Sequence, residues 1–177
     1  MSTEQFLNAV LPTQGHRFGL NTFGKQGDPD FRPAQRQFAP GDTTDLISYA
    51  MWGSGQGANA YFAVGGYVVG LHPETKKPQR LAHLAQWHRC LRLDRDVGPD
   101  NDYHTKQEAL TGALGLNAHF GMPDPWIVDS GAGFHLYWAF DRDVTLAEWL
   151  PMASRLRAAC EPFGLLGDHT TTIDAAR

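Results

Sequence analysis

Two aspartates, two residues apart, are the first feature of this 177-residue chain that has the chemistry of a reaction centre. Asp94 and Asp96 lie in the largely apolar segment LRLDRDVG, residues 91–98. Residues i and i+2 of a β-strand point to the same face, so both carboxylates would leave one surface together. Carboxylates this close repel each other, and a bound Mg²⁺ or Mn²⁺ relieves the repulsion through the oxygen ligands that these ions prefer. The spacing therefore indicates a divalent-metal site, while a solvated acidic strand end is the alternative interpretation.

A second segment, VDSGAGFHLYW at residues 128–138, adds a glycine turn and a histidine. Ser130 and Gly133 belong to a predicted tight turn whose backbone N–H groups could meet phosphate oxygens. After it, Phe134, Leu136, Trp138 and Phe140 alternate onto an apolar face, which leaves His135 and Tyr137 on the polar face. A histidine beside a metal site can bind a triphosphate, although a hydrogen-bonded surface histidine has the same pattern. The two segments together indicate metal-assisted phosphate chemistry.

A third carboxylate is needed for a two-metal site of the phosphoryl-transfer kind. Asp168 and Asp174, near the end of the sequence, compete for that role. Either of them could instead cap a turn among the neighbouring threonines. Cys90 is interpreted as a small buried apolar residue and not as a nucleophile.

Composition restricts the class of protein. Apolar residues make up 42% and charged residues 19% of the chain, which is typical of a folded domain, or of two small lobes, and not of a disordered polypeptide. Cys90 and Cys160 form no CxxC pair, so we expect no zinc knuckle, no disulfide framework and a reducing cytoplasm. The net charge of −4 argues against a strong sequence-blind DNA coat. It leaves room for an acidic polymerase-type site with a local basic strip, whose candidates are Lys76, Lys77, Arg80, Arg89 and Arg92.

In the first half, apolar spacing predicts a helix over Thr3–Leu11 that Pro12 ends. Strands are expected near 17–21 and 36–38, and a second helix from a cap at Thr43 or Thr44 to about Trp52. Residues 59–69 are expected to form one strand, or two strands broken at Gly65 and Gly66. A helical turn over 81–88 would lead into the acidic strand.

In the second half, the expected order is strand, helix, strand, strand, helix. The strands cover residues 90–97, 126–129 and 134–140, and a capping box at Thr105–Glu108 opens the first helix. A second capping box at Thr145–Glu148 opens the other helix, in which Pro151 either makes a kink or marks the first position. This order predicts an RRM-like or palm-like α+β sheet with its helices on one face.

The segments LDRDVG, VDSGAGFHLYW and GDHTTTIDAAR together resemble the catalytic core of the archaeo-eukaryotic primase superfamily, and most closely the primase-polymerases (PrimPol) of phages and mobile elements. Asp94 and Asp96 match that superfamily's acidic strand motif, and Ser130 with His135 matches its second motif. Asp168 best matches the final acid, because a TxDxxR segment follows it in similar proteins. Here that segment consists of Thr172, Asp174 and Arg177.

The resemblance implies an α+β fold with an N-terminal αβ module, 1–86, packed on an RRM-like catalytic module, 87–177, and an active site in the cleft between them. It implies a DNA primase or DNA polymerase that performs template-directed nucleotidyl transfer on single-stranded DNA with NTP or dNTP. Two ions of Mg²⁺ or Mn²⁺ would be held by Asp94, Asp96 and Asp168. The phosphates of the nucleotide would be held by Ser130, Gly133, His135 and Arg177.

The chain departs from the family pattern at two places. Arg95 stands between the two acids, where the family usually has an apolar residue, so we expect it to be paired or solvated. The family pattern also continues past the final arginine, so we expect a fragment of a longer protein with a helicase or accessory domain behind it. Alternative functions are a replication-initiator module with weak or no catalysis, a metal-dependent phosphodiesterase, and a structural partner domain without a metal.

Overall fold

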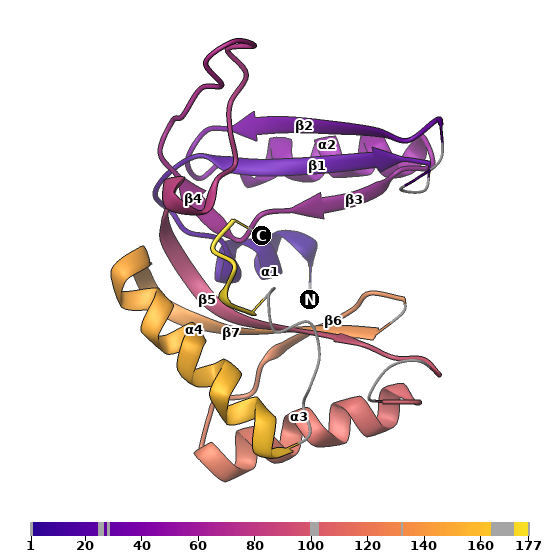
Figure 1. Cartoon of the computed structure of the whole chain (residues 1–177), viewed down its shortest axis with the longest axis vertical. Coiled ribbons are helices and arrows are strands. Elements are labelled where there is room, and N and C mark those ends of the chain that lie inside the picture. Colours follow the sequence, from indigo (N-terminus) through magenta and orange to yellow (C-terminus); the bar gives the residue numbers. More distant parts are fainter. Residues whose placement is uncertain are drawn as a thin grey trace. The chain divides into compact units, whose positions relative to one another are not determined.

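The computed structural model describes residues 2–24, 27, 29–99, 103–131, 133–163 and 172–176. The fold is α+β, with two antiparallel sheets whose strand orders are β2-β1-β3 and β4-β5-β7-β6 (Figure 1). The chain divides into two compact units, each described by itself below. Unit 1 comprises residues 1–89, 142–146 and 175–177, and unit 2 comprises residues 90–141 and 147–174. Among the described residues, no helix has the length and apolar character that crossing a bilayer requires.

Unit 1 is built on the three-stranded sheet. Its central strand β1 (Arg17–Phe23) pairs antiparallel with β2 (Arg32–Phe38) on one side and with β3 (Asn59–Phe62) on the other. The expected strands are confirmed, and β2 begins earlier than its apolar pattern indicates. Two helices, α1 (Thr3–Val10) and α2 (Thr43–Gly55), complete this part of the unit.

The two helices of unit 1 begin at different kinds of cap. α1 starts at a capping box in which Ser2 and Gln5 exchange side-chain and backbone hydrogen bonds. α2 starts at Asp42, whose carboxylate accepts the Asp45 N–H, so the prediction of a threonine cap is wrong. The Thr43 hydroxyl has another use, because it accepts a hydrogen bond from Arg17 and donates one to Asn8. The helix also continues to Gly55 instead of ending near Trp52.

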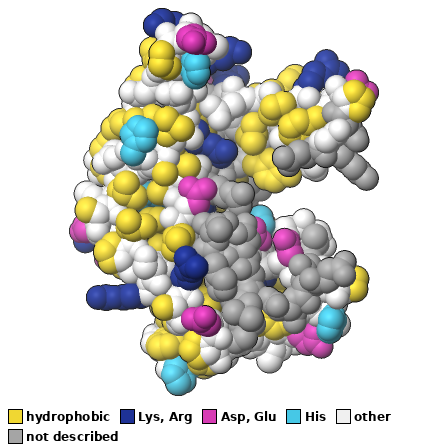
Figure 2. Space-filling model, viewed as in Figure 1, with side chains coloured by type: hydrophobic (Ala, Val, Ile, Leu, Met, Phe, Trp, Pro, Cys, Tyr) yellow, Lys and Arg dark blue, Asp and Glu magenta, His cyan; other side chains and the backbone are white. Residues whose placement is uncertain are grey.

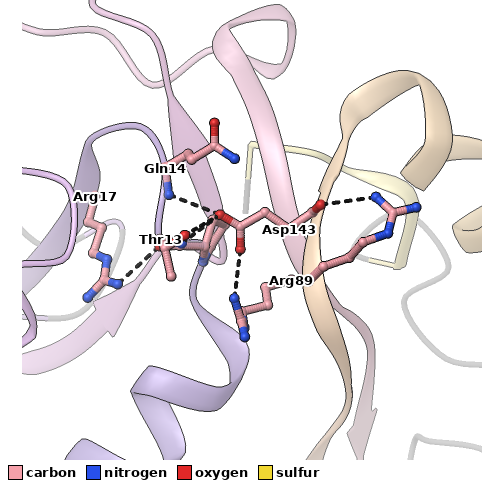
Figure 3. Close-up of polar contacts among 7 residues, drawn as sticks. Thr13, Gln14, Arg17, Arg89 and Asp143 are labelled. Atoms are coloured by element: carbon pink, nitrogen blue, oxygen red, sulfur yellow. Dashed lines mark hydrogen bonds and ion pairs between the residues drawn. The ribbon is translucent and has the colours of Figure 1, made fainter.

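A buried carboxylate ties distant segments of unit 1 together (Figure 3). Oδ2 of Asp143 accepts hydrogen bonds from the backbone N–H groups of Thr13 and Gln14, at 2.8 and 3.0 Å, and from the Thr13 hydroxyl at 2.7 Å. Its Oδ1 lies 3.1 Å from a guanidinium nitrogen of Arg89. The short strand β4 (Gly65–Tyr67) pairs with the first residues of β5 (Ala85–Asp96), preceded by the 3-10 turn η1 (Ala82–Leu84). The chain leaves the first sheet at residues 63–64, so β3 and β4 belong to different sheets, and Gly65 and Gly66, where the break was predicted, are the first residues of β4.

Unit 2 has the element order strand, helix, strand, strand, helix that the sequence predicts. After β5 come α3 (Lys106–Phe120), β6 (Trp126–Asp129), β7 (Gly133–Thr145), α4 (Leu146–Cys160) and the 3-10 turn η2 (Glu161–Phe163). β7 lies between β5 and β6 in the sheet, and β6 and β7 pair antiparallel across the tight turn. β5 and β7 are longer than expected, and each has one end in unit 1.

Local signals set both ends of α3. Thr105 and Glu108 form the predicted capping box, and Gly121 ends the helix in the left-handed conformation with φ +60°. In contrast, α4 starts at Leu146 and contains Pro151 in its interior, so a start at Pro151 is wrong. The apolar face of β7 packs against this helical layer, since the Trp138 indole donates a 3.0 Å hydrogen bond to Asn117 of α3.

Candidate functional site

An aspartate and the histidine singled out in the sequence meet on adjacent strands of unit 2. Nε2 of His135, on β7, lies 3.3 Å from Oδ1 of Asp94, on β5. Both side chains remain partly accessible, with exposed fractions of 35% for His135 and 30% for Asp94. Oδ1 of Asp94 is itself shielded from solvent and makes no hydrogen bond, so this contact is an ion pair. A carboxylate atom of this kind retains the capacity to accept a further ligand.

The strand period determines what surrounds this pair. Cys90, Arg92, Asp94 and Asp96 alternate onto one face of β5, and the last of them is exposed. On β7 the Tyr137 side chain shares the face of His135, and its hydroxyl lies 3.5 Å from Nδ1 of that histidine. The polar face predicted from alternation is therefore present, and the Asp94–His135 contact brings together one residue of each motif.

The negative charge on this face changes the protonation of His135. The contact with Asp94 raises the pKa of His135 above its ordinary value, against the lowering effect of burial. The charges of Asp94 and Asp96 add to the rise, and Arg92 opposes it. The neighbouring carboxylates therefore stabilise the protonated form of His135, and a protonated imidazole is a cation that attracts phosphate oxygens.

Two further titratable groups on this face, Tyr137 and Cys90, are held neutral. Burial raises the pKa of Tyr137 above its ordinary range. Burial likewise raises the pKa of the Cys90 thiol to about 12. A thiol of that kind is not a nucleophile at neutral pH, in agreement with the interpretation of Cys90 as a packing residue.

Arg92 is a cation on the same face of β5 as the acids, and it is almost fully buried. Its guanidinium donates a 2.6 Å hydrogen bond to the backbone carbonyl oxygen of Asp174. Sequence reasoning placed Arg92 in a basic strip and Asp174 among the candidate acids. The structure thus brings the tail segment beside β5 through a main-chain atom of Asp174.

The predicted turn after β6 is present, and the lack of a side chain at Gly133 is required for steric reasons. The backbone N–H of Ser130 donates to the carbonyl oxygen of Gly133 at 3.1 Å, and Gly131 has φ +88°. A Cβ atom on Gly133 would overlap the carbonyl oxygen of Arg95 on β5. Gly133 is therefore required for the close approach of two strands, which is a role independent of any nucleotide.

Lys106 is a charged residue beside this turn that sequence reasoning did not identify. Its ammonium lies 2.6 Å from Asp129 and 5.6 Å from the centre of the Phe134 ring. Asp129 also accepts a 2.8 Å hydrogen bond from the Gly131 N–H. The contacts with Lys106 and then Gly131 lower the pKa of Asp129. No sequence signal could have found this pair, because Lys106 and Asp129 belong to separate elements.

Arg95 points away from the acids, as the strand period requires. Its side chain is buried, with 2% of its surface exposed, and it donates a hydrogen bond to Cys160 of α4. Burial raises the pKa of the Cys160 thiol, and the charge and hydrogen bond of Arg95 oppose that rise. An opening of Arg95 to water is excluded, and Cys160 is a partner on the covering helix.

Two of the predicted site residues, Asp168 and Arg177, lie outside the described residues. Within residues 2–24, 27, 29–99, 103–131, 133–163 and 172–176, no group of three His, Cys, Asp or Glu side chains is placed to hold a metal ion. The predicted ligand set includes Asp168, so this finding concerns only part of that set.

Comparisons with protein-family models, with curated proteins and with solved structures gave no match for this chain.

Proposed function

We propose that this chain is a template-directed nucleotidyltransferase of the primase-polymerase kind, acting on single-stranded DNA with NTP or dNTP. The observation that carries the proposal is the pairing of Asp94 with His135 on neighbouring strands, with Asp96 two residues further along the same face. An RRM-like catalytic module of the archaeo-eukaryotic primase fold is the arrangement we infer for unit 2. Its element order and its strand order β5-β7-β6 support that inference.

The acids fit the ligand chemistry of Mg²⁺ or Mn²⁺. Asp94 is partly accessible, with Oδ1 turned toward Nε2 of His135, and Asp96 is exposed on the same face. Oxygen donors of this kind suit hard divalent cations. Asp168 is the third ligand in this proposal. When bound, such ions would activate the attacking 3′-hydroxyl and stabilise the charge of the leaving pyrophosphate.

The other residues of the face would orient the nucleotide. The contact with Asp94 favours the protonated form of His135, in which the ring could donate to a phosphate oxygen. The Ser130 hydroxyl is exposed at the turn that leads into β7, so it could donate to the same group. Arg177 completes the proposed phosphate-binding set. The proposed setting is the bacterial cytoplasm, in a phage-encoded or mobile-element protein.

Extension of a primer is the direct test. The protein is incubated with Mn²⁺, labelled nucleotides and a single-stranded DNA template, with and without an annealed primer. Nucleotide incorporation that Asp94→Ala and Asp96→Ala abolish supports the proposal. Degradation of the template, sensitive to the same substitutions, would instead identify a phosphodiesterase.

The matched control is Asp124→Ala, which removes an exposed carboxylate from unit 2 that belongs to neither the site nor a described ion pair. This variant should extend primers at the parent rate. Template binding without incorporation under any tested metal or nucleotide would contradict the proposal and favour an initiator module.

A further inference from the structure

A cluster of aromatic side chains lies on the surface of unit 1, along one side of α2. Tyr49 and Trp52 are three residues apart, so they are neighbours on the helix surface. Their rings are stacked, with centroids 5.9 Å apart and planes at 22°. The Phe23 ring meets Trp52 edge-on at 6.1 Å. Trp52 nevertheless remains 54% exposed, so its indole is fixed in place and still open to a partner.

A cation is held against the same cluster. The guanidinium of Arg36, on the edge strand β2, lies 5.2 Å from the centre of the Phe38 ring and 6.0 Å from that of Tyr49. Arg32 alternates onto the same face of β2, and this strand contains no acidic residue. Figure 2 shows Lys and Arg side chains and hydrophobic side chains next to one another over the three-stranded sheet.

These side chains line an open groove of about 430 Å³. That volume is within the range of sites that take small organic groups, about 300–1,000 Å³. The lining combines two aromatic rings and a guanidinium with one hydroxyl and one carboxylate. The lining residues are Arg36, Asp45, Ser48, Tyr49 and Trp52.

The groove is organised before any ligand binds. The Tyr49 hydroxyl donates a 2.7 Å hydrogen bond to the Ala34 carbonyl oxygen, which ties α2 to β2. The Asn21 amide donates to the Tyr49 carbonyl oxygen at 3.0 Å. Fixed aromatic rings lose little conformational entropy on binding, so their contact with a ligand is not offset by ordering them.

We propose that this groove binds single-stranded nucleic acid, with a base stacked on Trp52 and the adjoining phosphates beside Arg36 and Arg32. Stacking platforms combined with a basic strip are the general means of holding single strands. The carboxylate of Asp45 and the hydroxyl of Ser48 can accept hydrogen bonds from the exocyclic amino group of a base. A duplex offers no exposed base face here. The choice of a nucleic-acid occupant rests on the proposed function, but binding at the groove requires neither the metal site nor a nucleotide.

The test is fluorescence anisotropy with a labelled 20-nucleotide single strand of mixed sequence, in EDTA and without nucleotide. Trp52→Ala should weaken binding by about 5- to 100-fold, the range for loss of one base-stacking ring. Trp52→Phe should retain most of the affinity. Arg36→Ala should weaken binding and lower the slope of log K against log salt by about 0.7, as expected for one lost phosphate contact with a single strand.

Tyr61→Ala is the matched control, because Tyr61 is a 50% exposed aromatic residue of the same unit that does not line the groove. It should bind the single strand like the parent. Equal affinity of Trp52→Ala and the parent would overturn the proposal, as would an equal loss in Tyr61→Ala. A dimer of the parent that Trp52→Ala converts to a monomer, by analytical ultracentrifugation, would also overturn it and assign this face to contacts between copies.

The two proposals fail separately. Absence of primer extension, with strand binding that still depends on Trp52, rejects the nucleotidyltransferase and leaves the groove. If Asp94→Ala abolishes primer extension but Trp52→Ala leaves strand binding unchanged, only the proposal for the groove is rejected.

Discussion

Asp143 in unit 1 and Asp94 in unit 2 are both partly or fully sheltered carboxylates, but they differ in how many partners they have. The Asp143 side chain is 4% exposed, and its oxygens accept three hydrogen bonds in addition to the ion pair with Arg89. The Asp94 side chain is 30% exposed, and its Oδ1 meets Nε2 of His135 without a regular hydrogen bond. A saturated carboxylate holds segments together, whereas one with spare acceptor capacity can bind a ligand.

Removal of the saturated carboxylate should cause the largest loss of stability. Asp143→Ala should lower the free energy of unfolding by about 3–5 kcal/mol, because it leaves a partly buried Arg89 and two backbone donors without their acceptor. Urea denaturation monitored by circular dichroism measures this. A loss below about 1 kcal/mol, the range of a surface ion pair, would remove the distinction between the two aspartates.

Asp94→Ala should have the opposite profile. Nucleotide incorporation should fall by about 10²- to 10³-fold or more, the size seen when one charge-stabilising group is lost from a reaction centre. The free energy of unfolding should change by less than about 1 kcal/mol, because relief of the repulsion between Asp94 and Asp96 offsets the loss of the partly exposed pair with His135. Primer-extension rates and urea denaturation of the same preparation give both values. Incorporation at the parent rate would reject the metal-ligand role.

Gly133→Ala tests whether the glycine beside the site is there for packing. The added methyl group would overlap the Arg95 carbonyl oxygen, so β5 and β7 must separate. We expect a loss of about 1–3 kcal/mol in the free energy of unfolding, the usual cost of overpacking. Thermal denaturation measures it, and Gly115→Ala, where a Cβ meets open space, is the control. An unchanged melting temperature would show that the strands are farther apart than described.

The pKa of His135, and with it the pH dependence of stability, should depend on the contact with Asp94. Because the folded pKa of His135 is raised, the pair stabilises the protein fully below the ordinary histidine value near 6.5. That contribution is lost as pH rises through the raised folded pKa. Asp94→Asn should lower the pKa of His135, as measured by NMR titration of the ring proton and assigned with His135→Gln. If the pKa of His135 is the same in the parent and in Asp94→Asn, the two side chains do not interact.

The smallest effect is expected at Asp174. Its contact with Arg92 uses the backbone carbonyl oxygen, which Asp174→Ala retains, so incorporation should change by less than Asp168→Ala changes it. Mn²⁺-dependent extension by the two variants decides between the acids. A silent Asp168→Ala variant would transfer the third carboxylate role to Asp174.

Local patterns in the sequence predicted most elements of both units. The capping box at Thr105 and the glycine at Gly121 determine α3, because cap hydrogen bonds involve residues only a few positions apart. The alternation of residues 134–138 likewise predicted which face His135 would share with Tyr137. The alternation also placed Arg95 opposite the acids. These features depend on backbone period and on neighbouring residues, which a sequence displays directly.

Only the folded chain decided how the elements meet. The distance between Asp94 and His135 depends on β7 lying next to β5, and no local pattern specifies that order. The cap of α2 moved to Asp42 because Arg17 and Asn8 occupy the Thr43 hydroxyl. The groove beside Trp52 likewise depends on tertiary packing, because its lining residues come from both α2 and the edge strand β2. Contacts between residues far apart in sequence arise from packing. The chemistry of single residues could therefore be predicted from the sequence, but the neighbours of each residue in space could not.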